Sequence, residues 1–188
     1  MEQIRHYFEQ ITKLSDQDWA TFSSKLIKET FPKRSLLLEA GKMEHYLSFI
    51  QEGIIRFYIP GEQHDLTFSF AFANEFVAAY DSFLTHEPAT YHVEALTDTV
   101  LWRLTHDDLQ TIYDQTAVGN RIGRHASETL FLKKTKREFS LLHDTAEERY
   151  LKLFTEQPHL IRNIPLKYLA SYIGITPQAL SRIRKRIS

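Results

Sequence analysis

Apolar residues recur at helical spacing near both ends of the chain and follow a shorter period in between. Residues 2–13 and 16–30 carry large apolar side chains three or four positions apart, which predicts two amphipathic helices. From Ser35 to about Leu104 the chain breaks into short runs rich in Ile, Val, Phe, Tyr and Thr, separated by turn signals that contain Gly, Asn or Pro. This middle region predicts a β-sandwich or barrel, for which the jelly roll is one closed solution.

Helical spacing returns after Thr105, a residue suited to an N-cap, and continues to about Gln115. A longer helix is predicted from about Gly119 to Leu142. Its apolar stripe is too broad to face water alone, and it begins with Ile122, Ala126 and Leu130. The packing partner is either the chain's own β-region or the same helix of a second copy, and one helix can contact both. We expect a homodimer through this helix.

The last residues, IPLKYLASYIGITPQALSRIRKRIS, predict two short helices joined by a turn. The apolar residues of the first helix share one face, and they are Leu166, Leu169, Ala170 and Ile173. Gly174 supplies the backbone freedom of a sharp turn, and Thr176 can cap a second helix that has Pro177 at its first position. This arrangement is typical of a helix-turn-helix DNA-binding motif.

The second of these helices is basic on its outward face, and its inward residues are predicted to be Leu180, Ile183 and Ile187. Gln and Arg side chains can bond base edges bidentately, whereas Lys and further Arg side chains serve phosphates. The predicted DNA-binding residues are Thr176, Pro177, Gln178, Ser181, Arg182 and Lys185, together with Lys167 of the first helix. Arg149 and Lys152 are further candidates for phosphate contacts. The alternative is an ordinary amphipathic hairpin with a solvated charged face.

Charge divides the chain into an acidic and a basic part. Residues 1–132 contain 11 Lys+Arg and 19 Asp+Glu, a balance of −8, and residues 133–188 contain 12 Lys+Arg and 5 Asp+Glu, a balance of +7. The near-neutral total of 23 Lys+Arg against 24 Asp+Glu hides this difference. A basic C-terminal region is suited to the phosphate backbone of DNA, from which an acidic N-terminal region would stay clear.

Composition excludes several classes of protein. With 43% hydrophobic residues and only 6 Gly and 6 Pro among 188 residues, the chain is predicted to be folded rather than disordered. It has no Cys, which excludes disulfides, thiolate zinc sites, iron–sulfur clusters and cysteine nucleophiles. No apolar stretch approaches the ~20 residues of a membrane span, so we expect a cytoplasmic protein without a membrane partner.

Nine His residues raise the question of a metal site. No His-x-His or His-Glu-x-x-His spacing occurs, and His64, His86 and His92 belong to separate predicted elements. A nucleophile elbow and a phosphate-binding loop are also missing. We therefore predict no metal ligand, no catalytic residue and no enzymatic activity. A cupin-like metalloenzyme, whose barrel would fit residues 35–104, is the least favoured alternative because its metal motif is missing.

Four segments resemble the Crp/Fnr family of bacterial transcription regulators. His45–Ile59 is similar to the family's strand, Gly-containing turn and strand, Ala73–Phe83 to its effector-pocket segment, and Tyr91–Leu104 to its last strands. The ending LASYIGITPQALSRIRK resembles the version of the DNA-binding motif that is common in Bacteroidetes-type members. The order of the segments makes the resemblance extend over nearly the whole chain.

The resemblance implies an α+β protein of three parts. Residues 1–118 would form an N-terminal double-stranded β-helix, which is a jelly-roll-like sensor domain of the cyclic-nucleotide-binding type. Residues 119–143 would form the long dimerisation helix, and residues 144–188 would form the C-terminal helix-turn-helix domain. The implied partners are double-stranded DNA, a second copy of the chain and RNA polymerase.

The predicted effector pocket departs from the family pattern. Members that bind a cyclic nucleotide carry a Gly-Glu pair where this chain has Ala78-Ala79, and an Arg-Ser pair where it has Ala89-Thr90. Alanine can neither accept the ribose hydrogen bond nor pair with the phosphate, so we expect no cyclic AMP and no fixed cofactor. Either another small-molecule effector binds or side chains fill the pocket. Its candidate residues are Phe76, Ala78, Ala79, Tyr80, Ala89 and Thr90, with Phe83, Tyr91 and Trp102 as further lining.

In the family, base contacts fall on positions that correspond to Pro177, Gln178 and Arg182, with Ser181 between them. Many members have Glu where this chain has Gln178. Because Glu accepts from cytosine whereas Gln pairs with adenine, we expect the DNA half-site to differ from the usual one at that base pair. A ligand-sensing β-roll whose tail is an oligomerisation hairpin without DNA affinity remains the main alternative.

Overall fold

The computed structural model describes residues 1–187; Ser188, at the end of the predicted recognition helix, lies outside the described residues. The chain divides into two compact units. The first comprises residues 1–57 and 70–128, and the second comprises residues 58–69 and 129–188. The predicted domain boundaries after residues 118 and 143 remain a prediction, because compactness alone does not show which parts fold or act separately.

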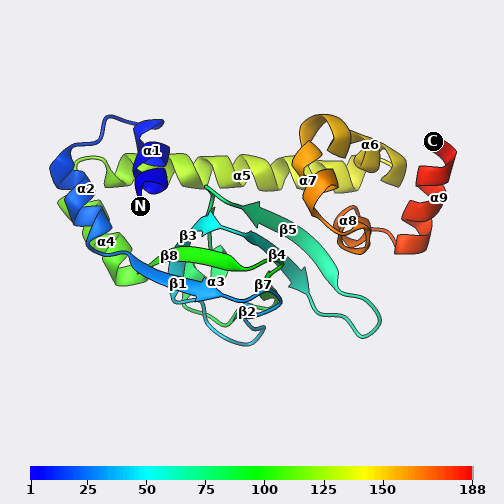
Figure 1. The fold of residues 1–188 in the computed structure, drawn as a ribbon, viewed down its shortest axis with the longest axis horizontal. Coiled ribbons are helices and arrows are strands. Elements are labelled where there is room, and N and C mark those ends of the chain that lie inside the picture. The colour runs from blue at the N-terminus through cyan, green and yellow to red at the C-terminus, as the bar shows by residue number, and fades with distance from the viewer. Residues whose placement is uncertain (188) are drawn as a thin grey trace. The chain divides into compact units, whose positions relative to one another are not determined.

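Two four-stranded sheets make up the β-roll (Figure 1). The strands are β1 (Ile27–Phe31), β2 (Leu36–Leu38), β3 (Tyr46–Glu52), β4 (Ile54–Ile59), β5 (Leu66–Phe72), β6 (Phe76–Val77), β7 (His92–Ala95) and β8 (Thr99–Thr105). Their orders are β1-β8-β3-β6 and β2-β7-β4-β5. In the antiparallel pair β3–β8, Phe49 lies opposite Trp102 and Ser48 opposite Arg103. Because side chains alternate along a strand, these two pairs lie on opposite faces of the sheet.

An apolar core joins one face of this sheet to the helices of the first unit. The helices are α1 (Glu2–Glu9), α2 (Asp16–Ser23), α3 (Tyr80–Thr85), α4 (His106–Gln115) and the start of α5 (Gly119–His143). The buried residues of the core are Ile4, Phe8, Phe22, Phe49, Phe83, Leu104, Leu109 and Ile112. The predicted α+β class is confirmed, and so is the long helix after residue 118.

The helix that the sequence pattern predicts over residues 16–30 is shorter in the structure. α2 ends at Ser23, and the following segment becomes strand β1. β1 pairs antiparallel with β8, from Ile27 opposite Arg103 to Phe31 opposite Thr99. The hydrogen bonds offered by β8 decide the conformation of this segment, because tertiary pairing overrides a weak local preference for helix.

The second unit contains the helices that follow α5. They are α6 (Ala146–Glu156), α7 (Pro158–Asn163), α8 (Leu166–Tyr172) and α9 (Pro177–Ile187). Thr145 and Glu148 form a capping box that starts α6. A compact core holds the helices together through the buried residues Tyr150, Leu153, Leu160, Ile164, Leu169, Ala170, Tyr172, Ile173, Leu180 and Ile183. Within residues 1–187, every helix is too short or too polar to cross a membrane.

Candidate nucleic-acid interface

The turn between α8 and α9 is built from local backbone hydrogen bonds. Gly174 has a φ of +77°, a left-handed conformation that favours glycine. The N–H of Ile175 donates to Ala170 O at 3.0 Å, and the N–H of Gly174 donates to Ser171 O at 3.0 Å. This 6→1 and 5→2 pair is the Schellman motif, which satisfies the last carbonyls of α8 and sets the direction of the chain.

α9 begins with the cap that the sequence predicts. Thr176 Oγ1 accepts from the N–H of Ala179 at 3.2 Å, and Pro177 occupies the first helical position. Leu180 and Ile183 are buried as predicted. Ile187 was expected to face inward, but it is 38% exposed because it lies in the last turn of the helix, beyond the buried residues. The orientation of α9 is therefore defined by its first two turns.

Two arginines donate hydrogen bonds to carbonyl groups at the end of α8. Arg137 donates to Tyr172 O at 2.7 Å and lies over the Tyr172 ring at 3.8 Å from its centre. Arg149 Nε donates to Ile173 O at 2.8 Å. Burial lowers the pKa of Arg137, although its contacts with Tyr172 act in the opposite direction. Cations at the C-terminus of a helix complement its dipole, so both arginines stabilise the turn that positions α9.

Two predicted phosphate-binding candidates are engaged inside the second unit. Arg149 binds the end of α8, and Lys152 Nζ lies 2.6 Å from Asp144 Oδ2. Arg186, at the far end of α9, pairs with Glu147 of α6. These contacts help hold the helices together, so the three side chains are less available for DNA than their charges suggest.

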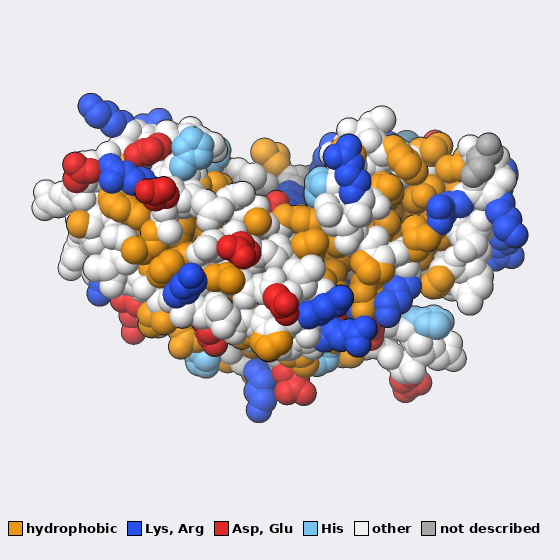
Figure 2. Space-filling model, viewed as in Figure 1, with side chains coloured by type: hydrophobic (Ala, Val, Ile, Leu, Met, Phe, Trp, Pro, Cys, Tyr) orange, Lys and Arg blue, Asp and Glu red, His pale blue; other side chains and the backbone are white. Residues whose placement is uncertain are grey.

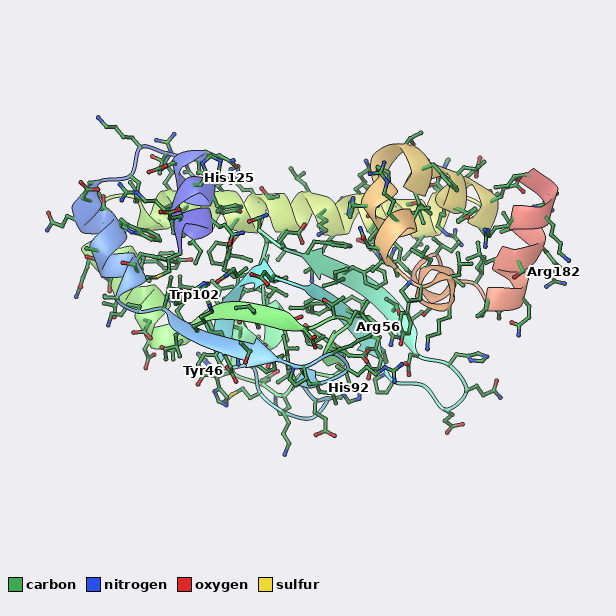
Figure 3. All side chains as sticks on the ribbon, in the orientation of Figure 1. Tyr46, Arg56, His92, Trp102, His125 and Arg182 are labelled. Carbon is green, nitrogen blue, oxygen red and sulfur yellow. The ribbon has the colours of Figure 1, made fainter. Side chains whose placement is uncertain are left out.

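The outward face of α9 carries exposed polar side chains. Gln178, Ser181, Arg182 and Lys185 are exposed, and none of the four has a side-chain partner among residues 1–187. Figure 3 shows Arg182 extending outward from α9, and Figure 2 shows Lys and Arg side chains gathered over this helix. Thr176, Pro177 and Lys167 are also exposed. The structure thus places all of the predicted DNA-binding residues at the surface of the second unit.

The hydroxyl group of Ser171 in α8 bonds to the backbone on both sides of Leu66, where β5 begins. Ser171 Oγ accepts from the N–H of Thr67 at 2.7 Å and donates to Asp65 O at 2.7 Å. Thr67 is fully buried. Residues 58–69 therefore belong to the same compact unit as the two-helix motif. No sequence pattern indicates this contact, because a serine in an amphipathic helix has no distinguishing pattern.

The predicted effector-pocket residues have different surroundings in the structure. Phe76, Ala78 and Tyr80 pack against the apolar core beneath the helices, as do the further candidates Phe83 and Trp102. The Phe76 ring lies 5.1 Å from that of Phe49 and 5.8 Å from that of Phe8. Ala79 and Ala89 are buried apart from this core, whereas Thr90 is exposed. Phe76, Tyr80, Phe83 and Trp102 therefore lie in the core or pack against it.

Ion pairs inside the β-roll form a feature that the sequence reasoning missed. Arg56 and Arg103 are 3% and 7% exposed, and each has a carboxylate partner. The available signal was a single Arg within an otherwise apolar strand, as in IIRFYI and LWRLT. A charged side chain in such a strand is rarely buried unless it is paired.

The predicted dimer-helix residues Ile122, Ala126 and Leu130 are only partly buried. Ile122 packs against the apolar core of the first unit, so one side of α5 is covered by the chain itself. Further along α5 the apolar side chains are more exposed, and these are Phe131 (67%), Leu132 (66%), Phe139 (65%) and Leu142 (78%). This exposed stripe is the part of α5 that would bury the most apolar surface on contact with another protein.

Metal-binding side chains are scattered. Across residues 1–187, no three His, Asp or Glu side chains come together in an arrangement that could hold a metal ion.

Comparison with known proteins identifies the β-roll. Residues 28–116 match the sequence model of the cyclic nucleotide-binding domain. No curated protein matches the chain. Among solved structures, the chain is similar to CLP, a c-di-GMP-responsive global regulator from Xanthomonas campestris, with a TM-score of 0.73 and 15% identity over 92% of this chain and 91% of that one.

Two further structures share the fold. One, from Eubacterium rectale, is described as a transcriptional regulator of the Crp/Fnr family; its TM-score is 0.74 with 16% identity, over 96% of this chain and 87% of that one. The other is FixK2 from Bradyrhizobium japonicum, with a TM-score of 0.73 and 14% identity over 86% of this chain and 84% of that one. Residues 28–116 match the model of the cyclic nucleotide-binding domain, and the chain as a whole shares its fold with solved transcription regulators of the Crp/Fnr type. The resemblance seen in the sequence is confirmed at this level, while the Bacteroidetes-type assignment remains a prediction.

Proposed function

We propose that this protein is a sequence-specific DNA-binding transcription regulator of the Crp/Fnr type. In this proposal α8 and α9 are the helix-turn-helix motif, and α9 enters the major groove. The observation that carries it is the outward face of α9, where Gln178, Ser181, Arg182 and Lys185 are exposed and have no side-chain partner within residues 1–187. The helix itself is fixed by a Schellman turn and a Thr176 cap. Polar side chains that are free and well positioned are what base recognition requires.

The roles within this set follow from side-chain chemistry. Gln178 and Arg182 lie four positions apart, so they project from the same face of α9. Glutamine can bond adenine bidentately and arginine can bond guanine bidentately, and these two residues would read the sequence. Thr176, Ser181, Lys185 and Lys167 would contact phosphates, and Pro177 would bring the start of α9 close to the bases.

We propose that the active form is a homodimer that binds two half-sites. The exposed apolar stripe of α5 supports this, because four large apolar side chains in water are unfavourable unless a partner covers them. Helix-turn-helix proteins commonly bind paired half-sites one turn of DNA apart. Changing Phe139 and Leu142 together to Ser should convert the dimer to a monomer in light scattering, whereas a persistent dimer would move the interface elsewhere.

Selection of bound duplexes from a random DNA pool tests the proposed function. Wild-type protein should enrich a palindromic motif, and Arg182→Ala should lose one specified base pair, with affinity for the selected site about 10- to 100-fold lower. Arg121→Ala is the matched control, because Arg121 is an exposed arginine of the first unit and its loss changes the net charge equally. Equal enrichment by wild type and Arg182→Ala would contradict base reading by α9.

Salt dependence separates this function from the alternative of a β-roll protein with an oligomerisation tail. Binding to DNA through phosphate contacts weakens steeply as salt rises, because counterions are released from the DNA. An apolar hairpin contact barely responds. Lys185→Ala should reduce the slope of log affinity against log salt by about one. If the protein shows no salt-dependent DNA binding at all, the tail is not a DNA-binding element.

A further inference from the structure

The carboxylate of Glu44 is buried inside the first unit. Glu44 is 6% exposed, and its two oxygens accept hydrogen bonds from different parts of the fold. The N–H of Tyr46 donates to Oε1 at 3.0 Å, and the N–H of Ala79 donates to Oε2 at 3.4 Å. One carboxylate therefore joins the start of β3 to the residue that precedes α3.

The guanidinium of Arg103 lies beside the carboxylate of Glu44. Arg103 NH2 lies 3.7 Å from Glu44 Oε1, its Nε donates to Ser48 Oγ at 3.3 Å, and its NH1 lies 2.5 Å from Glu29 Oε2. The guanidinium stacks over the Tyr46 ring, 4.1 Å from the ring centre. Figure 3 labels Tyr46 in the β-roll. Backbone N–H groups beside an arginine are the usual donors to a bound anion, and here Glu44 supplies that anion.

The segment held by Glu44 contains several residues of the predicted effector pocket. Besides the Ala79 contact, the N–H of Glu44 donates to Ser82 Oγ at 3.0 Å, and the same hydroxyl donates to Glu87 O at 2.5 Å. Further along the segment, the hydroxyl of Tyr91 donates to Asp81. Burial is the main reason that the pKa of Tyr91 is raised, so this hydroxyl stays protonated and keeps donating. The segment of residues 79–91 is thus held in place by hydrogen bonds to Glu44 and by hydrogen bonds between its own residues.

The other buried polar side chains of the described residues also have partners. Arg56 NH1 lies 3.3 Å from Glu94 Oε2, and the two side chains are 3% and 13% exposed. Within the described residues, no buried side-chain nitrogen or oxygen lacks a hydrogen-bond partner. A ligand site that awaits an anion would be expected to leave donors or a guanidinium unpaired, because their partner is the ligand. The Ala79 N–H and the guanidinium of Arg103 both have partners within the chain.

We propose that Glu44 is a built-in ligand, whose carboxylate occupies the anion position between the Ala79 N–H and Arg103 and keeps the β-roll closed without a nucleotide. A phosphate that entered this position would meet a second negative charge in a medium of low dielectric, and the two repel. Burial raises the pKa of Glu44, whereas its N–H donors and Arg103 favour the ionised form. This inference concerns the β-roll alone and does not depend on DNA binding.

Chemical rescue tests the proposal. Glu44→Ala removes the carboxylate but leaves its donors in place, and thermal unfolding should occur about 5 °C or more below wild type. Sodium formate should restore at least half of this loss, because formate can enter the vacated position, whereas sodium chloride at equal ionic strength should not. Wild type should respond equally to both salts. A Glu44→Ala protein that does not distinguish formate from chloride would overturn the proposal.

Two controls keep the test decisive. Glu29→Ala removes the other carboxylate of Arg103, whose side chain is 47% exposed, and formate should give it no specific stabilisation because water already reaches that site. Calorimetric titration of wild type with cyclic AMP and with c-di-GMP should release no binding heat. Stoichiometric binding of either nucleotide to wild type would sink the proposal even if Glu44→Ala failed to fold. Glu44→Gln, which keeps the size and one acceptor oxygen, should fold and unfold at a temperature between those of wild type and Glu44→Ala.

Discussion

The interior of the β-roll and the outward face of α9 both carry arginine side chains, but they use them in opposite ways. Inside the β-roll, Arg56 and Arg103 are almost completely buried, and each faces at least one carboxylate. On α9, Arg182 is exposed and has no partner in the part of the chain described by the structure. The buried arginines are already paired within the chain, whereas Arg182 is available to bind another molecule.

The difference follows from the free energy of a charge in each place. A buried ion without its partner costs several kcal/mol, so an arginine can remain inside a folded domain only where a carboxylate accompanies it. An exposed guanidinium is already solvated by water and needs no partner. The residue type alone therefore does not indicate a ligand site, and the presence or absence of an internal partner is more informative.

The largest expected effect comes from breaking an interior pair. Arg103→Ala should lower the free energy of unfolding by about 3–5 kcal/mol, because it leaves Glu44 buried without its cation. Urea unfolding followed by circular dichroism measures this. Arg182→Ala is the matched substitution on α9 and should change the stability by less than about 0.5 kcal/mol. Equal losses in the two variants would remove the contrast between the regions.

A change of specificity tests the free face of α9. Gln178→Glu should shift the preferred base pair from one with adenine to one with cytosine at the position that Gln178 reads, with a discrimination of about 1–3 kcal/mol. Duplex selection with both proteins reports the change directly. Because the Gln178 side chain has no partner among residues 1–187, thermal stability should stay the same. An unchanged motif would assign the base contacts to other residues.

Two serines extend the comparison to hydroxyl groups. Ser171→Ala removes the hydroxyl that joins Asp65 O to the Thr67 N–H, and leaving a buried N–H without an acceptor should cost about 1–3 kcal/mol. Hydrogen exchange at the Thr67 amide should become faster. Ser181→Ala, on the exposed face of α9, should leave that exchange rate unchanged. Similar exchange in both variants would show that the Ser171 contact contributes little.

The smallest effect is a pH dependence at Asp144. Hydrogen bonds from Lys152 and Ser140 lower the pKa of this carboxyl group from 3.8 to about 2. Because the folded state has the lower pKa, the stabilisation is complete above about pH 4 and is lost as the pH falls through about 2. The urea midpoint of wild type should therefore fall more between these values than that of Asp144→Asn. Parallel curves would assign the acid sensitivity to other carboxyl groups.

The C-terminal two-helix motif could be predicted from the sequence, because the signals that shape it act over a few residues. Gly174, Thr176 and Pro177 encode a turn and a cap through their own backbone preferences, and the spacing of Leu180 and Ile183 selects the buried side of α9. The exposed face then follows from helical geometry alone. The short apolar runs separated by turn signals were likewise enough to predict a β-sandwich or barrel in the middle of the chain.

The pairing of the buried polar residues in the β-roll could not be predicted from the sequence and follows from contacts between distant parts of the chain. Nothing near Glu44 in the sequence marks it as a buried group, since its partners Ala79 and Arg103 lie 35 and 59 positions away. The same holds for β1, which became a strand because β8 offered it a hydrogen-bonding edge. Local pattern determines local conformation and which side of an element is apolar. Partners of a buried charge are brought together only when distant strands pair, so the closing of the predicted pocket by Glu44 is a property of the fold.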